Sequence, residues 1–155
     1  MTFRQAVERT AAVEGRYREG LRGIRNVDRQ RIHCSNPRML TGSIDLDEAL
    51  RVRNPNDPRW DYGIGVRVGA RSDIVIWAEV HPATSLHVDE VLTKLRWLRE
   101  RTGDSAPAFV ELGQHFCWVA TGSIAFRRGS PQEKRIAQQG LRFPVKRLNL
   151  DSYAA

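Results

Sequence analysis

Two acidic residues and a histidine stand at the ends of two apolar runs, and their chemistry suits a divalent metal ion. Asp61 opens a run in which apolar residues alternate with small or charged ones. Residues 73–80 are then almost continuously apolar until Glu79, and His81 follows two positions later. A buried carboxylate loses on the order of several kcal/mol of hydration unless a cation, a hydrogen-bond donor or solvent faces it. Glu79 therefore needs a partner, and a metal ion, a base pair and a salt bridge are all open at this point.

The segment between the two runs, residues 69–73, has the composition of a turn, which predicts a hairpin of antiparallel strands. The start of the first strand then lies near the end of the second, where Asp61 and Glu79 stand. At about 3.3 Å per residue, the two acids come within reach of one ion if a bulge or register shift absorbs the difference in strand length. Because side chains alternate along a strand, Glu79 and His81 are expected on the same face.

An acid, a spacer, and then acid-x-Lys on the adjacent strand is the pattern of the PD-(D/E)XK, or restriction-endonuclease-like, nuclease superfamily. Asp61 with Glu79-Val80-His81 resembles this pattern, with His81 in the position of the lysine. The expected order of elements, a helix, three strands, a helix and a strand, is also similar to the family core. The resemblance implies an α+β (α/β) fold over residues 1–155, a single nuclease-like domain with a central mixed β-sheet flanked by helices. It further implies Mg²⁺ or Mn²⁺ bound by Asp61 and Glu79, which with His81 form the expected catalytic set.

His81 has chemistry that suits the lysine position of the resemblance. A neutral imidazole accepts a proton near pH 7, its charged form faces a phosphate well, and it can bind a metal directly. Two alternatives stay open. His81 precedes Pro82 and can be a hydrogen-bonded residue at the strand boundary, or Lys94 in the following helix can supply the ammonium.

The first element is expected to be a helix that begins with a capping box of Thr2 and Gln5 and ends near Gly20 and Gly23. On its apolar face Glu14 falls between Phe3 and Val7, so its carboxylate would point toward the core. By resemblance to the superfamily, Glu14 is the candidate third acid of the metal site. The alternative is that it pairs with an arginine at the edge of the core.

The positions of proline and glycine and the spacing of apolar residues predict several further elements. Residues 31–34 and 42–46 are short strand candidates, residues 47–50 a helical turn, and residues 53–59 a loop that carries two prolines. Asp45 and Asp47 lie close enough to this region to reach the site, although acids beside turns are usually solvated or cap helices. The apolar stripe of residues 88–98 predicts a helix that packs on the sheet and ends at Gly103.

The last third of the chain predicts three more elements. Residues 109–112 and 116–120 read as a hairpin or an interrupted strand around residues 113–115. Ser130 and Pro131 begin a helix that ends before Gly140, and residues 141–145 alternate as a strand whose Pro144 favours a sheet edge or a bulge.

The net charge is +7 and the isoelectric point about 10.2, which suggests an anionic partner such as nucleic acid. Arginine is strongly preferred over lysine, and the base composition of a genome can cause this without any function. The clustering is more informative, because the segment from Arg127 to Arg147 has only Glu133 to oppose its positive charge. The predicted nucleic-acid-binding residues are Arg127, Arg128, Lys134, Arg135, Arg142, Lys146 and Arg147.

Other classes of site have little support. Cys34 and Cys117 are too few for a zinc or disulfide framework, and His33, His87 and His115 have no partners at metal-ligand spacing. Gly63 and Gly65 precede a strand, so they do not form a phosphate-binding loop. The chain has no apolar run long enough for a membrane span and no targeting signal, so a cytoplasmic protein with no membrane partner is expected.

Two functions from different classes fit these observations. The first is a metal-dependent phosphodiesterase acting on DNA or RNA. The second is a catalytically inactive nuclease-fold protein that binds nucleic acid or a protein partner through its basic surface, possible partners including a second copy of the chain.

Overall fold

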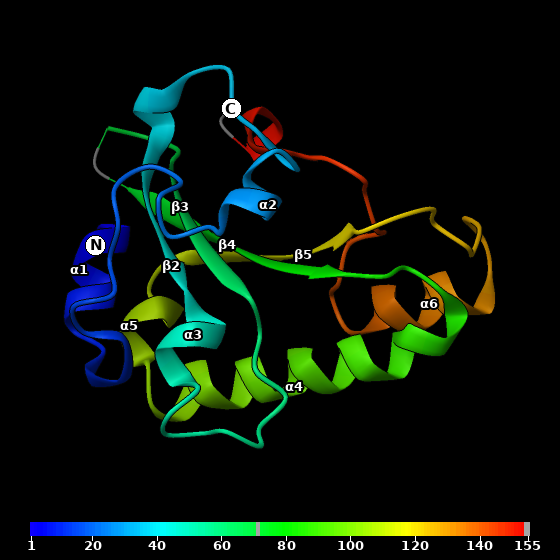
Figure 1. Cartoon of the computed structure of the whole chain (residues 1–155). Helices are drawn as coiled ribbons and strands as arrows, with labels where there is room; N and C mark the ends of the chain where they lie inside the picture. Colours follow the sequence, from blue (N-terminus) through cyan, green and yellow to red (C-terminus); the bar gives the residue numbers. More distant parts are fainter. Residues whose placement is uncertain (71, 154–155) are drawn as a thin grey trace.

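Four strands form a mixed sheet in the order β2-β3-β4-β5 in the computed structural model, which describes residues 1–70 and 72–153 (Figure 1). The strands are β2 (Leu40–Asp45), β3 (Tyr62–Arg67), β4 (Asp73–His81) and β5 (Gly113–Ala120). β3 is antiparallel to both β2 and β4, whereas β4 and β5 are parallel. Helices flank this sheet, so the predicted α+β fold of a single domain with a central mixed sheet is confirmed.

The hairpin that was expected from the turn composition is β3-β4. Tyr62 pairs with Ala78, and the register runs unbroken to Arg67 and Asp73. The Val68 amide closes the connection by donating to the carbonyl of Ser72 at 3.1 Å, while Arg71 of the predicted turn lies outside the described residues. Since Tyr62 faces Ala78, the preceding Asp61 faces Glu79 without any bulge in the hairpin.

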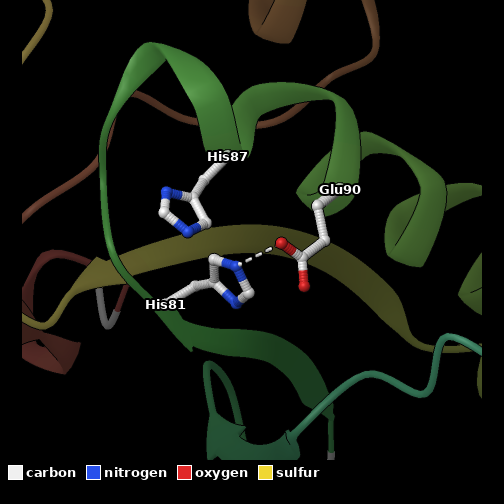
Figure 2. A group of neighbouring side chains, drawn as sticks. All are labelled: His81, His87 and Glu90. Atoms are coloured by element: carbon white, nitrogen blue, oxygen red, sulfur yellow. Dashed lines mark ion pairs between the residues drawn. The ribbon is translucent and has the colours of Figure 1, made fainter.

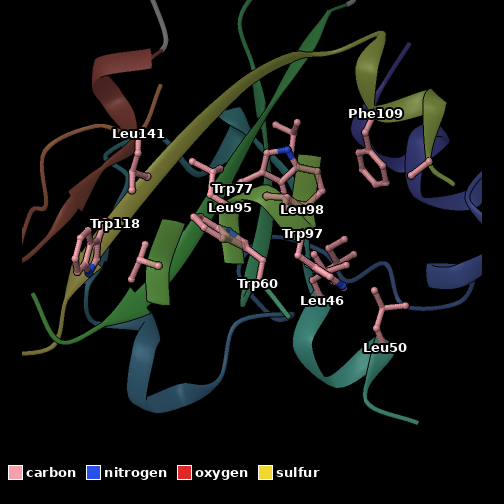
Figure 3. Packing of buried hydrophobic residues seen from close by; sticks show 14 of the residues in the cluster. Leu46, Leu50, Trp60, Trp77, Leu95, Trp97, Leu98, Phe109, Trp118 and Leu141 are labelled. Carbon is pink, nitrogen blue, oxygen red and sulfur yellow. The ribbon is translucent and has the colours of Figure 1, made fainter. Parts of the chain in front are cut away.

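The two faces of the sheet bury separate apolar clusters. One face packs Val75, Trp77 and Trp118 against α4 (Val88–Asp104) and its neighbours (Figure 3). On the other face, Tyr62 and Ile76 pack with residues from outside the sheet, among them Ile24, Ile32, Leu148 and Leu150. These residues belong to or adjoin α2 (Asn26–Arg29), η4 (Leu150–Tyr153) and a small parallel sheet of β1 (Ile32–His33) and β6 (Leu148–Asn149).

Gly63 and Gly65 lie inside β3, where they let large side chains approach the strand. A Cβ at Gly65 would lie 2.4 Å from the Phe3 ring, and one at Gly63 would lie 2.7 Å from the ring of Trp77. Phe3 belongs to α1 (Phe3–Glu8), and its amide donates to the buried carboxylate of Asp73 at 2.8 Å. The glycine pair therefore serves packing of α1 and Trp77, which agrees with its exclusion as a phosphate-binding loop.

The long first helix was predicted wrongly. The Thr2–Gln5 capping box is present, but α1 ends at Glu8, followed by η1 (Ala11–Val13). Beyond the turn at Gly15, whose φ is 82°, the amide of Arg18 donates to the carbonyl of Ser43 at 3.0 Å, and the Ser43 amide donates back at 2.9 Å. Pairing with the edge of β2 replaces helical hydrogen bonds in this segment, which local periodicity alone does not reveal.

The prediction of a packing helix after β4 is confirmed by α4, although Gly103 lies within its last turn. Trp97, which falls beside the apolar stripe, is 7% exposed and donates its indole N–H to Asp57 Oδ2 at 2.9 Å. No helix within residues 1–70 and 72–153 has the length and apolar composition that crossing a membrane requires.

The prediction of a hairpin or an interrupted strand around residues 113–115 is wrong. Residues 107–110 form a helical turn, α5 (Pro107–Val110), and β5 runs unbroken beside β4. Proline favours the first position of a helix, which explains why α5 begins at Pro107. The chain passes through α4 between β4 and β5, and this crossover makes the two strands parallel.

The remaining short elements agree better with expectation. α3 (Leu46–Leu50) follows β2, and α6 (Pro131–Gln138) begins at Ser130, whose side chain accepts from the Glu133 amide at 3.2 Å. The connections also contain η2 (Pro37–Met39) and η3 (Ser85–His87). Of the strand predicted at residues 141–145, only isolated bridges to β5 form, at Leu141 and Val145, because Pro144 cannot donate to a ladder.

Candidate active site

Asp61 and Glu79 meet at the open end of the β3-β4 hairpin. The Asp61 amide donates to Glu79 Oε1 at 3.1 Å, and the Val80 amide donates to Asp61 Oδ2 at 2.9 Å. Glu79 is fully buried, and Asp61 is 9% exposed. The antiparallel register thus holds two carboxylates side by side, away from bulk water.

Lys94 supplies the positive charge nearest to this acidic pair. Its ammonium forms an ion pair with Glu79 Oε2 from the facing helix α4, and its side chain is 16% exposed. Burial acts to lower the pKa of Lys94, but attraction to Glu79 and Asp61 outweighs it and raises the pKa. The alternative that Lys94 brings an ammonium to the site therefore agrees with the geometry.

Asp61 has an unusual protonation equilibrium. Burial first, and then the neighbouring charge of Glu79, raise the pKa of Asp61 from 3.8 to about 7, against the opposing influence of Lys94. Arg25 lies farther away, with a guanidinium nitrogen 3.8 Å from Asp61 Oδ1. The two acids repel each other, and the cations around them compensate only in part.

The donor set of the pair is the kind that Mg²⁺ and Mn²⁺ bind, since carboxylate oxygens suit both ions. Two of the oxygens, Asp61 Oδ2 and Glu79 Oε1, accept main-chain hydrogen bonds. The other two face cations, Asp61 Oδ1 toward Arg25 and Glu79 Oε2 toward Lys94. The residues fit a divalent ion by type and proximity, and binding would require the Lys94 and Arg25 side chains to move away from those oxygens.

His81 lies between two carboxylates. Its Nδ1 is 3.2 Å from Glu79 Oε2, and its Nε2 is 3.2 Å from Glu90 Oε2. The contact with Glu79 raises the pKa of the His81 imidazole despite the opposing effect of burial. Glu79 and His81 share one face of β4, as alternation along the strand requires.

His87 is next to His81, so the expectation that it lacks metal-ligating partners is wrong. The two imidazole centroids are 5.1 Å apart, and one ligand atom from each of His81, His87 and Glu90 lies within 4.8 Å of the others (Figure 2). His87 and Glu90 are three positions apart at the start of α4, and His81 ends the strand that leads into it. The three-residue spacing places His87 and Glu90 on one helix face, a signal that was available in the sequence.

Glu14 does not occupy the position that its predicted role required. It is exposed and follows η1, because the helix that was expected to carry it toward the core ends at Glu8. Asp45 accepts from the Glu48 amide and so caps α3, while Asp47 forms ion pairs with Arg51 and Arg59. Capping and surface pairing explain these two acids without a metal.

The seven basic residues predicted to bind nucleic acid are all exposed. Three of them, Arg128, Arg142 and Arg147, line a surface cavity of about 370 Å³. The Arg128 guanidinium stacks on Phe143 at 4.7 Å and that of Arg142 on Tyr153 at 4.5 Å. Arg135, by contrast, forms an ion pair with Asp89 of α4.

Comparison of the chain with protein-family models, with curated proteins and with solved structures found no match.

Proposed function

We propose that the protein is a divalent-metal-dependent phosphodiesterase of restriction-endonuclease-like architecture that acts on DNA or RNA. The observation that carries this proposal is the convergence of Asp61 and Glu79 from paired strands, with the Lys94 ammonium against Glu79. Two carboxylates and a basic side chain are the groups that a metal-assisted phosphodiester hydrolysis requires. The antiparallel hairpin and the helix over it bring them together from positions 18 and 15 residues apart.

In this proposal, Asp61 and Glu79 hold the ion. When bound, Mg²⁺ or Mn²⁺ would polarise the scissile phosphate and make water a better nucleophile. Lys94 and His81 both contact Glu79, and each can present positive charge to a phosphate or hold a proton near the attacking water. Lys94 thus takes the role that the sequence pattern had given to His81, with His81 beside it.

The arginine-lined cavity supports nucleic acid as the substrate. Glu79 pairs in register with Trp118 of β5, and the carbonyl of Trp118 accepts from the amide of Val145 at 3.0 Å. Val145 lies on the wall of the cavity, two strand spacings or about 10 Å from the main chain of Glu79. The arginines that line this cavity can bind the phosphates that flank a scissile bond, and Phe143 and Tyr153 hold the guanidinium planes of Arg128 and Arg142.

The test is cleavage of plasmid, single-stranded DNA and RNA with Mg²⁺ or Mn²⁺, using wild-type protein beside Asp61→Asn and Glu79→Gln. Both variants should lose at least about 100-fold in rate, since each removes an ionic ligand. Asp104→Asn is the matched control, because Asp104 is an exposed acid at the end of α4. Cleavage that survives in Asp61→Asn and Glu79→Gln would refute the assigned site.

A second candidate function is nucleic-acid binding without cleavage. It is favoured by the partners that already face all four carboxylate oxygens of Asp61 and Glu79. In that case Asp61→Asn and wild type bind nucleic acid equally, and neither cuts it with any divalent ion. Arg142→Ala should weaken binding and reduce the salt slope by about one unit, whereas binding independent of salt would remove nucleic acid as partner.

A further inference from the structure

We infer that His81, His87 and Glu90 form a binding site for a divalent transition-metal ion such as Zn²⁺, distinct from the Asp61–Glu79 pair. Two imidazoles and one carboxylate are a common ligand set of such ions, whereas Mg²⁺ prefers oxygen ligands alone. The site goes beyond the proposed phosphodiesterase, because it needs neither that activity nor an ion on Asp61.

The spacing of the donor atoms suits a shared ion. His81 Nε2 and Glu90 Oε2 are 3.2 Å apart. Two ligands of one tetrahedral zinc ion, each with a bond of about 2.0–2.1 Å, are roughly 3.3 Å apart. One donor atom of each of the three side chains lies within 4.8 Å of the other two, so a small side-chain adjustment of His87 completes the set. Figure 2 shows the three side chains facing one another, His81 from the end of β4 and the other two from the start of α4.

The strongest observation is the state of His81 Nε2. This nitrogen is buried, and within the described part of the chain it has no hydrogen-bond partner. Glu90 is near enough to pair with it, but the approach lacks the direction of a hydrogen bond. An unpaired buried polar atom is costly in a folded protein, and a metal ion on Nε2 removes that cost.

The surroundings orient both imidazoles toward the ion. Glu79, fully buried, lies 3.2 Å from His81 Nδ1, which favours the proton on Nδ1 and leaves the lone pair on Nε2. Thr84 Oγ1 lies 2.7 Å from His87 Nδ1, which leaves Nε2 of His87 as the free nitrogen. Carboxylate and hydroxyl partners on the second ring nitrogen are typical of metal-ligating histidines.

The site is open on one side. The Glu90 side chain is 57% exposed and that of His81 is 12% exposed, so the ion would lie at the protein surface with its protein ligands below it. Three protein ligands leave a fourth position for water or an added ligand, as in zinc sites that act on substrates rather than in closed structural ones.

Zn²⁺ binding to the chelator-treated full chain, measured by isothermal titration calorimetry, tests the inference, and Co²⁺ absorption reports the ligand geometry. Wild type should bind one ion per chain. His87→Ala and Glu90→Gln should each raise Kd by at least about 100-fold, since even loss of a group that only hydrogen-bonds to a ligand lowers metal affinity by about 10- to 100-fold. Both positions are partly exposed, and circular dichroism verifies that the variants fold. Thr84→Val should weaken binding by about 10-fold, an effect on orientation alone.

His115→Ala is the matched control, because His115 lies outside the cluster and should leave Kd unchanged. Asp61→Asn separates the two metal sites. If it abolishes Zn²⁺ binding while His87→Ala does not, the ion lies on the acidic pair and the inference is overturned, although the proposed phosphodiesterase survives. Unchanged binding in His87→Ala and Glu90→Gln, or no Zn²⁺ binding by wild type, also overturns it. Zn²⁺ binding without any cleavage would retain the site and reject the phosphodiesterase.

Discussion

The Asp61–Glu79 pair and the His81–His87–Glu90 cluster share strand β4 but differ in how their polar atoms are satisfied. All four oxygens of the acidic pair face amides or cations, and Glu79 is fully buried. The histidine cluster is partly exposed, and one of its buried nitrogens has no hydrogen-bond partner among the described residues. Lys94 already faces the acidic pair with a positive charge, whereas the buried nitrogen of His81 has no such partner among the described residues.

Burial alone therefore does not mark a metal site. A buried acid with a lysine beside it is stable without an ion, and an ion must displace the lysine to bind. A buried imidazole nitrogen without a partner has the opposite property, because binding there removes a cost. We therefore expect substitutions around the acidic pair to change stability in the absence of metal. Substitutions in the histidine cluster should instead change the stabilisation that added Zn²⁺ provides.

The largest effect is expected from Lys94→Met. It leaves the buried Glu79 charge without its ammonium, which should destabilise the chelator-treated protein by about 3 kcal/mol in urea unfolding. Glu79→Gln added to Lys94→Met should recover most of that loss, because the uncompensated charge is gone. A loss below about 1 kcal/mol would mean that Lys94 does not hold Glu79 in solution.

Zinc should stabilise the protein only through the histidine cluster. At a free concentration 100 times Kd, a ligand of the folded state adds about 2.7 kcal/mol to the free energy of unfolding. We expect this gain in wild type and Lys94→Met but not in His87→Ala, with thermal unfolding as the measurement. Equal stabilisation of His87→Ala would place the ion elsewhere.

Asp61→Asn should stabilise the chelator-treated protein at pH 8. Because the pKa of Asp61 is raised to about 7 in the folded state, its contribution to stability is complete below pH 4 and is lost as the pH rises to 7. The variant avoids that loss, so its advantage should grow over this range to an amount on the order of a few kcal/mol. Asp73→Asn is the contrasting control, since it removes the charge by which the buried Asp73 pairs with Arg67 and should destabilise. Parallel pH profiles of wild type and Asp61→Asn would show that burial and the charge of Glu79 do not raise the pKa of Asp61.

The smallest effect is expected from Arg135→Met. Its ion pair with Asp89 joins α6 to α4, but both side chains are at least half exposed. Exposed pairs contribute about 0–1 kcal/mol, so urea unfolding should change little. If Arg135→Met lost as much stability as Lys94→Met, exposure to solvent would not determine how much each ion pair contributes.

Elements with local signals could be predicted from the amino-acid sequence. The capping box at Thr2, the apolar stripe of α4, and two apolar runs around a turn each depend on neighbouring residues. Since an antiparallel hairpin also determines which residues face each other, the contact between Asp61 and Glu79 followed from the sequence as well.

The remaining contacts depend on tertiary packing, because they join segments whose relation no local pattern encodes. The course of the chain after η1 depends on pairing between Arg18 and Ser43, and the direction of β5 depends on the passage through α4. The same passage lays the first turns of α4 over the end of β4, which brings Lys94 to Glu79 and His87 to His81. Helix spacing predicts which residues share a face, but the packing of that face on the sheet chooses their partners.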